Sequence, residues 1–336
     1  NNNIQGITFT GAVTIDGSGH QFQGAGNILN GKLTIGAGGT NTTLNGTDMN
    51  GDLETEPNAT GIEITGATIA GTTTLNAAQT DIDDSIFTGA VNGVGATLNF
   101  NTDGEAGNQN TFAGAVTLSG ADVAMDNNVF NAGATVELSG DRPIFKDNTT
   151  EENVTIEGAG NAAVLNATVT GNTLNESANL IVNSDNSANT INNNISGNDI
   201  SGTLTESGTG NDMDSNSSGN LESNGTNAIV NGSTLSGTFT STGNGLTFTS
   251  NGTITGASSF EGDDLTLSDT TFNNTVAISG NNQSFNGNTF NNTVSGAGTT
   301  LNFNTDGEAG NQNTFAGAIT LSGADVAMDN NVFNAG

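Results

Sequence analysis

The segment Thr271–Asn288 has the sequence TFNNTVAISGNNQSFNGN, and its pattern decides the fold. Phe272 recurs as Phe290 at a step of 18 along the chain, and Val276 recurs at the same interval. Apolar residues alternate with polar ones, as in Val-x-Ile, which is typical of a strand with one buried face. Gly, Asn, Asp and Ser fill the gaps, and these residues accept the positive φ angles of tight turns. The pattern therefore predicts one coil of a parallel β-solenoid.

Regularly spaced Phe residues predict what fills the interior. The step from Phe290 to Phe315 is 25, because the insert NTDGEAGNQN lengthens that coil, and the step from Phe315 to Phe333 is 18 again. We expect the Phe residues to stack as ladders inside the solenoid, and the seven additional residues of a long coil to protrude. The expected ladders are Phe272, Phe290, Phe315 and Phe333, and separately Phe87, Phe112 and Phe130.

A second, longer period overlies the first. Thr97–Gly133 and Thr300–Gly336 are identical except at one position, and they are related by an offset of 203. The pattern, though not the identity, extends upstream, so that residues 61–133 match residues 264–336. We therefore expect one continuous β-solenoid over residues 1–336, built on a tandem unit with this period of 203. Because the chain lacks an initial Met and stops in mid-coil, we expect it to be an internal segment or a processed piece of a longer protein.

The coils can be followed along the whole chain through their apolar residues. The signal is weakest between about Ala178 and Gly225, a stretch rich in Asn. Outside the Phe ladders, the expected inward positions include Phe9, Val13, Ile15, Phe22, Ile28, Leu33, Ile35, Leu44, Leu53, Ile62, Ile64, Val136, Leu138, Ile144, Val154, Ile156, Val164, Ile181, Ile191, Ile195, Ile200, Ile229, Leu235, Phe239, Leu246, Phe248, Ile254 and Phe260.

The composition agrees with a narrow solenoid. Hydrophobic residues make up 32 % of the chain, whereas about 45–50 % (counting Gly) is usual for a globular domain. A solenoid needs fewer, since each coil contributes only a handful of inward side chains. Disorder is the alternative that low hydrophobicity suggests, but the sustained alternation of β-branched and aromatic residues argues against it. No apolar run approaches the length needed to span a membrane, and the absence of Cys excludes disulfides.

The charge is strongly acidic. There are 34 Asp and Glu residues against Lys32, Arg142 and Lys146, which gives a net charge of −31. Nucleic-acid binding by phosphate neutralisation needs clustered basic residues, so the composition excludes that class. An acidic surface keeps the protein soluble and repels its own copies at low salt. It also suits an environment with divalent cations or high salt.

The irregular spacing bears on the handedness. Three hexapeptides make up a coil of 18, so a left-handed solenoid is one alternative. The apolar spacings here are 4, 2, 7 and 5 rather than 6, and crossovers between parallel strands are right-handed by default. The predicted fold class is therefore all-β, a right-handed parallel β-helix (β-solenoid) with coils of about 18–25 residues.

The F-x-x-x-V-x-[IL] coils, the Asn-Gly and Asn-Asn turns and the long-period duplication resemble the right-handed β-helix repeats of giant bacterial or archaeal surface proteins. Autotransporter passenger domains, filamentous-haemagglutinin-like adhesins and extracellular fibres belong to this group. The resemblance implies a non-enzymatic stalk or filament at the extracellular surface. Its implied partners are other copies of itself, end to end or laterally, and cell-surface glycans. The motif marks an architecture and not a ligand.

Polysaccharide lyases and hydrolases also use this fold, so a polysaccharide-binding or polysaccharide-degrading protein is the main alternative. Such chemistry needs a base near acidic groups. One coil holds Asp141, Arg142, Lys146 and Asp147. Surface charge pairing is the simpler interpretation of these four.

Other titratable residues make poor catalysts on sequence grounds. His20 is the only His, and the turn GSGHQF offers it no evident catalytic or metal-binding partner, so we expect an exposed turn residue. Two acidic pairs are sequence neighbours that a strand would point to opposite faces, namely Asp83 with Asp84 and Glu151 with Glu152. We therefore predict no catalytic residues.

Ca²⁺ is the one ligand with a local signal. Oxygen ligands alternate around a Gly in the insert of each long coil, and alternating carboxylates in a turn can supply several of the six to eight oxygens that Ca²⁺ takes. The candidate ligands are Asn101, Asp103 and Glu105, and their counterparts Asn304, Asp306 and Glu308; Asp212, Asp214 and Asn216 have a similar spacing. An ordinary Asn/Asp turn remains the alternative. We expect the loops Asn101–Asn110 and Asn304–Asn313 to bulge from the same face.

Ice binding by a solenoid requires flat and regular rows of Thr on an outward face. Thr14, Thr34, Thr117 and Thr155 are expected to share a column that Glu54 and Glu137 interrupt. The interruptions argue against ice binding.

Overall fold

The computed structural model describes residues 2–101, 105, 107–140, 142–157, 168–175, 178–184, 193–250, 252–304, 308–323 and 325–334. Strands account for 52 % of the structure and helix for 1 %, so the prediction of an all-β fold is confirmed. The described helix η1 (Ala309–Asn311) is a single 3₁₀ turn. The chain divides into two compact units, Asn1–Asn175 and Glu176–Gly336, each of which is a stack of parallel coils. One continuous solenoid over both units stays a prediction.

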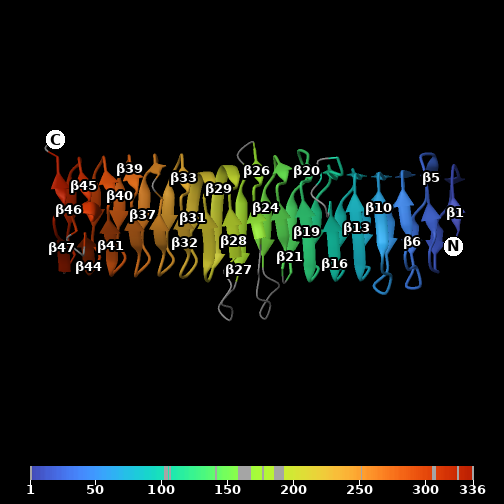
Figure 1. The fold of residues 1–336 in the computed structure, drawn as a ribbon, viewed down its shortest axis with the longest axis horizontal. Helices are drawn as coiled ribbons and strands as arrows, with labels where there is room; N and C mark the ends of the chain where they lie inside the picture. Colours follow the sequence, from blue (N-terminus) through green and yellow to red (C-terminus); the bar gives the residue numbers. More distant parts are fainter. Residues whose placement is uncertain are drawn as a thin grey trace. The chain divides into compact units, whose positions relative to one another are not determined.

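Each regular coil contributes three short strands. In unit 1, for example, β10 (Ile62–Thr65) is followed by β11 (Thr68–Ile69) and β12 (Thr73–Leu75), and each pairs in parallel with its counterpart in the next coil. The first strands of the coils form sheet A, and the second and third strands form sheet B. Figure 1 shows these strands lying side by side in successive coils of each unit.

The strands of unit 1 have the following bounds. Sheet A contains β1 (Asn3–Ile4), β4 (Gln21–Phe22), β7 (Thr43–Asn45), β10, β13 (Gln79–Asp83), β16 (Thr97–Phe100), β19 (Asp122–Asp126), β22 (Ile144–Lys146) and β25 (Thr168–Thr170). Sheet B contains β2 (Thr8–Phe9), β3 (Val13–Ile15), β5 (Asn27–Leu29), β6 (Leu33–Ile35), β8 (Thr47–Met49), β9 (Leu53–Thr55), β11, β12, β14 (Ile86–Phe87), β15 (Val91–Gly93), β17 (Thr111–Phe112), β18 (Val116–Leu118), β20 (Val129–Phe130), β21 (Val136–Ser139), β23 (Thr149–Thr150), β24 (Val154–Glu157) and β26 (Thr173–Leu174).

Unit 2 repeats the arrangement, except that β29 and β31 each run through both parts of sheet B. Sheet A contains β28 (Asn193–Ser196), β30 (Asn211–Asp214), β32 (Ile229–Asn231), β35 (Thr247–Thr249), β38 (Thr266–Ser268), β41 (Gln283–Asn286), β44 (Thr300–Phe303) and β47 (Asp325–Met328). Sheet B contains β27 (Leu180–Ser184), β29 (Asp199–Gly208), β31 (Ser217–Ser223), β33 (Thr234–Leu235), β34 (Phe239–Ser241), β36 (Thr253–Ile254), β37 (Ser258–Phe260), β39 (Thr271–Phe272), β40 (Val276–Ile278), β42 (Thr289–Phe290), β43 (Val294–Gly296), β45 (Thr314–Phe315), β46 (Ile319–Leu321) and β48 (Val332–Phe333).

The contacts between coils confirm the predicted coil lengths. Strand β39 pairs with β42, and β42 with β45. The corner hydrogen bonds just before these strands join Thr270 to Asn288, a step of 18, and Asn288 to Asn313, a step of 25. A shorter step of 17 joins Asn216 to Ser233. The coil length therefore varies while these strands stay in register, and a register shift occurs between β29 and β31.

Both Phe ladders are confirmed. In unit 2, ring centroids are 5.2 Å apart for Phe272 and Phe290, 5.0 Å for Phe290 and Phe315, and 5.4 Å for Phe315 and Phe333, all in stacked geometry. In unit 1, the corresponding steps from Phe87 through Phe112 to Phe130 are 5.2 and 4.9 Å. The rings are buried, apart from Phe333 in the last described coil. Stacking of like on like thus fills this part of the interior.

A few inward assignments were wrong by one residue. Ile144 is exposed and Phe145 is buried beneath sheet A instead. Ile28, Ile181 and Ile229 are likewise only half-buried, and the inward positions belong to Leu29, to Leu180 and Val182, and to Val230. Phe9 and Val13 are also half-buried, in the first described coil. Ile191 and Val164 lie outside the described residues.

The corner between the first and second strands follows one rule. It begins with a residue in the left-handed region, such as Gly46 (φ 61°), Asn127 (φ 51°) or Asp269 (φ 53°). Gly, Asn and Asp tolerate this conformation best, which explains why they recur at the coil period. The sharp bend redirects the chain from sheet A into sheet B.

The next residue of many such corners is a buried Asn, and these residues form a ladder. The Asn128 backbone N–H donates to Asn148 Oδ1 (2.8 Å), and the Asn148 N–H donates to Asn172 Oδ1 (2.9 Å). Asn148 Nδ2 donates to the Met125 carbonyl (2.9 Å). Each side chain thereby satisfies main-chain groups that the bend removes from the strand ladder. The sequence pattern predicts turns at these Asn residues but not a buried ladder.

Replacing Phe290 by Ala should destabilise unit 2 by about 3–5 kcal/mol, because the ring is fully buried between two stacked neighbours. The matched control is Thr289→Ala on the same strand, whose side chain points outward and should cost no more than about 1 kcal/mol. Denaturant unfolding would measure both. Equal losses for the two variants would contradict a packed Phe ladder.

Candidate functional site

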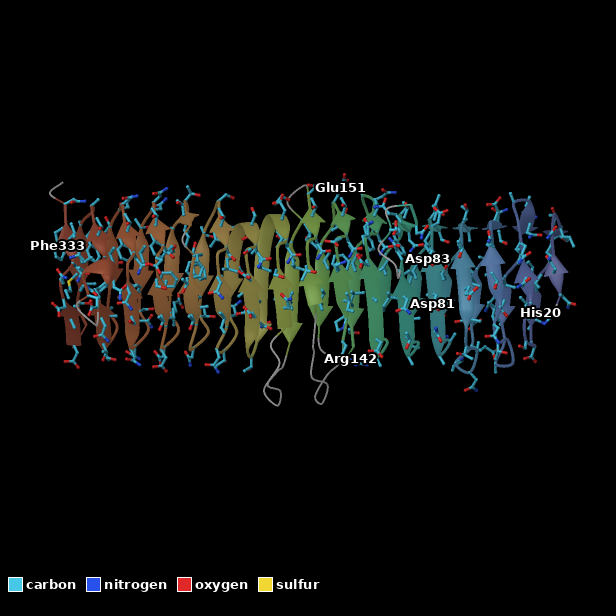
Figure 2. The ribbon with its side chains drawn as sticks, in the orientation of Figure 1. His20, Asp81, Asp83, Arg142, Glu151 and Phe333 are labelled. Carbon is cyan, nitrogen blue, oxygen red and sulfur yellow. The ribbon has the colours of Figure 1, made fainter. Side chains whose placement is uncertain are left out.

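Acidic side chains of unit 1 occupy outward positions on sheet A. Asp81 and Asp83 alternate along β13, and Figure 2 labels both on this strand. Asp81 accepts hydrogen bonds from Asn99 Nδ2 in the next coil (2.7 Å) and from Gln79 Nε2 (3.0 Å). Glu63 accepts one from Thr43 Oγ1 (3.3 Å). Amides and hydroxyls of the same or a neighbouring coil therefore hydrogen-bond the Asp81 and Glu63 carboxylates.

The two neighbouring acid pairs lie at the end of a strand and in a turn. Asp84 lies just beyond β13, at a corner with φ 49°, so it leaves the strand rather than pointing to its opposite face. Glu152 accepts a hydrogen bond from the Gly133 N–H (2.8 Å), and Glu151 is exposed in the same turn (Figure 2). The two side chains of each pair therefore lie in different surroundings.

The basic residues are all paired with carboxylates. Arg142 Nη2 lies 2.6 Å from Asp122 Oδ1, and Lys146 Nζ lies 2.9 Å from Asp126 Oδ2 and 3.1 Å from Asp147 Oδ2. The hydrogen bond to Asp126, and then that to Asp147, raise the pKa of Lys146, which keeps its amine protonated. Arg142 is labelled in Figure 2. These contacts favour the charge-pairing interpretation over a catalytic base.

The third basic residue, Lys32, is also paired with a carboxylate. Lys32 forms an ion pair with Glu54 in the next coil, and the hydrogen bond to Glu54 raises the pKa of Lys32. Asp141 lies outside the described residues. Both acidic and basic side chains therefore reach between coils on the outer surface of unit 1.

His20 is half-buried rather than exposed as expected (Figure 2). Its carbonyl accepts the Thr43 N–H (2.9 Å), which continues the strand ladder at the start of β4 and β7. Its ring lies beside Gly17, where an added Cβ would come within 3.0 Å of Nε2. These contacts indicate that His20 has a packing role.

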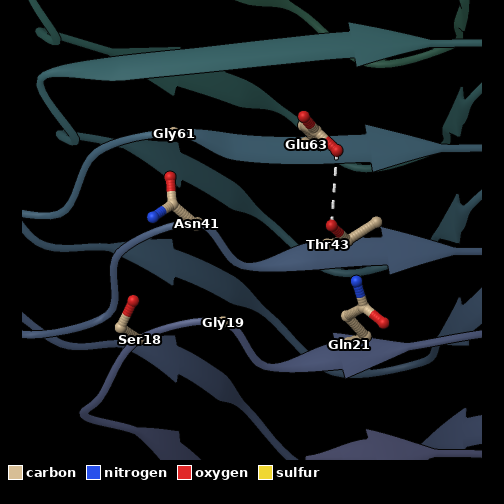
Figure 3. A pocket seen from close by; sticks show the side chains of 7 residues that line it. All are labelled: Ser18, Gly19, Gln21, Asn41, Thr43, Gly61 and Glu63. Atoms are coloured by element: carbon tan, nitrogen blue, oxygen red, sulfur yellow. Dashed lines mark hydrogen bonds between the residues drawn. The ribbon is translucent and has the colours of Figure 1, made fainter. Parts of the chain in front are cut away.

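A polar hollow of about 450 Å³ opens on sheet A close to His20 (Figure 3). Side chains from successive coils line it, and Glu63 is its charged member. The lining residues are Ser18, Gly19, Gln21, Asn41, Thr43, Gly61 and Glu63. Hydroxyl, amide and carboxylate groups of this kind can hydrogen-bond a polar ligand such as a sugar, although the lining contains no aromatic platform.

The predicted Ca²⁺ loops occupy equivalent corners of the two units, between β16 and β17 and between β44 and β45. Asn101 and Asn304 are fully buried and left-handed there, with φ 58° and 61°. Their Nδ2 groups donate to the Glu105 and Glu308 carbonyls, both at 3.3 Å. Glu105 and Glu308 themselves are exposed, as expected for a protruding insert. Asp103 and Asp306 lie outside the described residues.

The two loops share one unexplained feature. The Oδ1 atoms of Asn101 and Asn304 are buried and have no hydrogen-bond partner among the described residues. A buried acceptor without a partner costs free energy, and its occurrence in both copies is compatible with a ligand that supplies one. Within the part of the chain that the structure describes, no three His, Asp or Glu side chains are grouped to hold a metal. The Ca²⁺ assignment stays a prediction.

The third acidic triplet is separated by the fold. Asp212 and Asp214 point outward from β30, whereas Asn216 is buried and donates to the Ile195 carbonyl (2.7 Å). Burial, and then the neighbouring Asp214, raise the pKa of Asp212. Asn216 belongs to the interior, so these three residues do not form one site.

The predicted Thr column is confirmed on sheet B of unit 1. Thr14 pairs with Thr34, and Thr34 with Glu54, so an acidic side chain interrupts the row. Further along, Thr117 pairs with Glu137, which pairs with Thr155. The interrupted row gives no support to ice binding at this face.

Comparison with protein families, with curated proteins and with solved structures found no match to this chain. The described part of the chain contains no helix of the length and apolar character required to cross a membrane. Function is therefore inferred from the fold and its side chains.

We expect the protein to take up Ca²⁺ at the two long-coil loops, and Ca²⁺ to raise the melting temperature. The free-energy gain should approach about 2.7 kcal/mol when free Ca²⁺ is a hundred times the Kd. Replacing Asp103 and Asp306 together by Asn should abolish uptake, because it removes a carboxylate ligand from each loop. The control Asp212→Asn and Asp214→Asn removes two charges elsewhere. If calorimetry shows no heat of binding and chelator does not shift the melting temperature, the Ca²⁺ prediction is wrong and the loops are ordinary Asn/Asp turns.

Proposed function

We propose that this chain is a non-enzymatic structural repeat protein, which forms a stalk or filament of the extracellular surface and binds other copies of itself end to end or laterally. The observation that carries the proposal is the repeated register. Thr97 pairs with Asp122 in unit 1, and its counterpart Thr300 pairs with Asp325 in unit 2. A repeated sequence therefore yields a repeated coil. Since every coil adds one strand spacing, the length of such a protein grows with the number of its repeats.

The side chains also support a structural role. Charged groups of the described residues are used in contacts between coils, as in Arg142 with Asp122 and Lys146 with Asp126. Interior positions are used for stacking. The acidic surface is consistent with an exterior location where cations screen repulsion between copies.

Carbohydrate recognition is the second candidate, and the polar hollow on sheet A favours it. Gln21, Thr43 and Glu63 are register neighbours on three coils, so their polar groups are spaced regularly along the hollow. A sugar chain lying along that line could contact all three. Degradation of polysaccharide would in addition need a free base, and Arg142 and Lys146 are both paired.

Electron microscopy of native material should show thin fibres. The tandem unit, with its period of 203, comprises about ten coils, so the axial period should be roughly 50 Å at ~4.8 Å per coil. Compact isolated particles of 33.5 kDa would contradict the filament proposal.

Assays with acidic and neutral polysaccharides separate the alternatives. We expect no cleavage by the purified chain. Turnover that disappears in the double variant Arg142→Gln and Lys146→Gln would overturn the structural role. Binding without cleavage that is lost in Gln21→Ala with Thr43→Val, and kept in the outward control Thr289→Ala, would establish the carbohydrate-binding alternative instead.

A further inference from the structure

Unit 2 has a carboxyl group in its interior. In β29, Leu204 and Glu206 point inward while Thr205 between them is only half-buried, so Glu206 occupies a core position and is 0 % exposed. Its register neighbours are Val182 in the preceding coil and Ser223 in the following one. An ionisable side chain therefore occupies an inward position whose counterpart in the preceding coil is the apolar Val182.

Neutral groups of the described residues hydrogen-bond both oxygens of this carboxyl. Asn211 Nδ2 donates to Oε2 at 2.6 Å, and Ser223 Oγ donates to Oε1 at 2.7 Å. The Gly225 N–H also donates to Oε1, at 3.2 Å. A Cβ at position 225 would come within 2.4 Å of Oε2 and 2.9 Å of the Gly208 carbonyl oxygen, so a larger residue would displace the carboxyl from this contact. The surroundings are fitted to a carboxyl group.

No charged side chain of the described, packed elements faces Glu206. The chain's three basic residues all belong to unit 1 by sequence. Described residues of β27 include none that is charged. On β29, β30 and β31 the other ionisable residues are Asp199, Asp214 and Glu222, which are exposed, and Asp212, which is half-buried at an outward position. An ionised Glu206 would thus have no opposite charge to compensate it.

Burial opposes ionisation more strongly than the hydrogen bonds favour it. Loss of hydration raises the pKa of Glu206, and the hydrogen bonds from Ser223, Asn211 and Gly225 lower it by less. The net direction is upward. Removing water from an unpaired charge is the largest electrostatic cost in a protein interior.

We propose that Glu206 makes the coils from Asp199 to Ser223 a pH-sensitive point of unit 2, closed when its carboxyl is protonated and prone to open when it is ionised. Opening would separate β29 from β31, because only an open coil lets water reach the carboxylate. This device is independent of the proposed stalk function, since it would operate in any protein that contains this coil.

The direction of the pH effect follows from linkage. The pKa of Glu206 is higher in the folded than in the unfolded state, so the folded state holds the proton more tightly. The resulting stabilisation is fully present below the ordinary Glu pKa. It is lost as the pH rises through the raised folded value. Unit 2 should therefore weaken toward neutral and alkaline pH.

Hydrogen exchange of the whole chain, followed across pH, tests the proposal. Amides of β29 and β31 should lose protection in the wild type as pH rises, beyond the intrinsic acceleration of exchange. In Glu206→Gln they should keep it, and the unfolding transition of unit 2 above the Glu206 pKa should rise by about 2–4 °C. Gln stays neutral, and Asn211 can turn its amide to accept from the new Nε2. Under acid conditions wild type and variant should coincide.

The control Glu222→Gln removes an exposed charge from the neighbouring strand and should leave the protection of β29 unchanged. If Glu206→Gln folds poorly, Ser223→Ala serves instead, because it removes a donor to the ionised carboxylate. That variant should steepen the pH-dependent loss. A wild type whose protection does not change with pH, or an effect of equal size in Glu222→Gln, would overturn the proposal.

Discussion

The in-register stacking of one coil on the next is the constraint on which the rest of the structure depends. Each inward side chain lies directly over the residue at the same position of the preceding coil, so Phe290 stands between Phe272 and Phe315. Every residue then has nearly the same neighbours as its counterpart one coil away. Such an environment selects like residues, which explains why rings stack on rings and why the Asn residues of the corners form a ladder.

The same constraint decides where the chain may vary. Additional residues cannot enter a strand without shifting its register, so most length changes lie at corners, and the extra residue within β29 produces a register shift against β31. The inserts of the long coils follow the left-handed Asn101 and Asn304, and the strands on either side still pair residue by residue. Outward positions are free of the stacking requirement. Apart from the buried Glu206, they carry the acidic residues of the described strands, several of which contact amides, hydroxyls or the few basic side chains of adjacent coils.

Much of this fold could be predicted from the sequence, because periodicity encodes stacking directly. The unequal steps between successive Phe residues placed both Phe ladders correctly, long coils included. Errors arose where two apolar residues are adjacent, as with Ile144 and Phe145 or with Ile28 and Leu29. Alternation alone does not decide which of the two points inward. Register with the neighbouring coil does, since Phe145 lies opposite Met125.

The side chains that matter chemically were harder to predict. The buried Asn ladder has a sequence signal, namely Asn after a left-handed residue at many first corners, but Asn is equally common in ordinary turns. Glu206 could have been found from Leu204-x-Glu206, which puts a carboxyl in the inward phase of a strand. Catalytic and calcium-binding chemistry depends on distances across coils that the sequence does not contain.

Disulfide trapping tests the stacked register most directly, because the natural chain has no Cys. Thr289 and Thr314 are outward register partners in adjacent coils, and Thr271 lies one coil further from Thr314. Adjacent strands are about 4.8 Å apart, within disulfide reach, whereas two coils exceed the limit of about 7 Å. Mild oxidation should therefore cross-link Thr289→Cys with Thr314→Cys and leave Thr271→Cys with Thr314→Cys reduced. A cross-link only in the second pair, or in neither, would contradict the register and with it the solenoid.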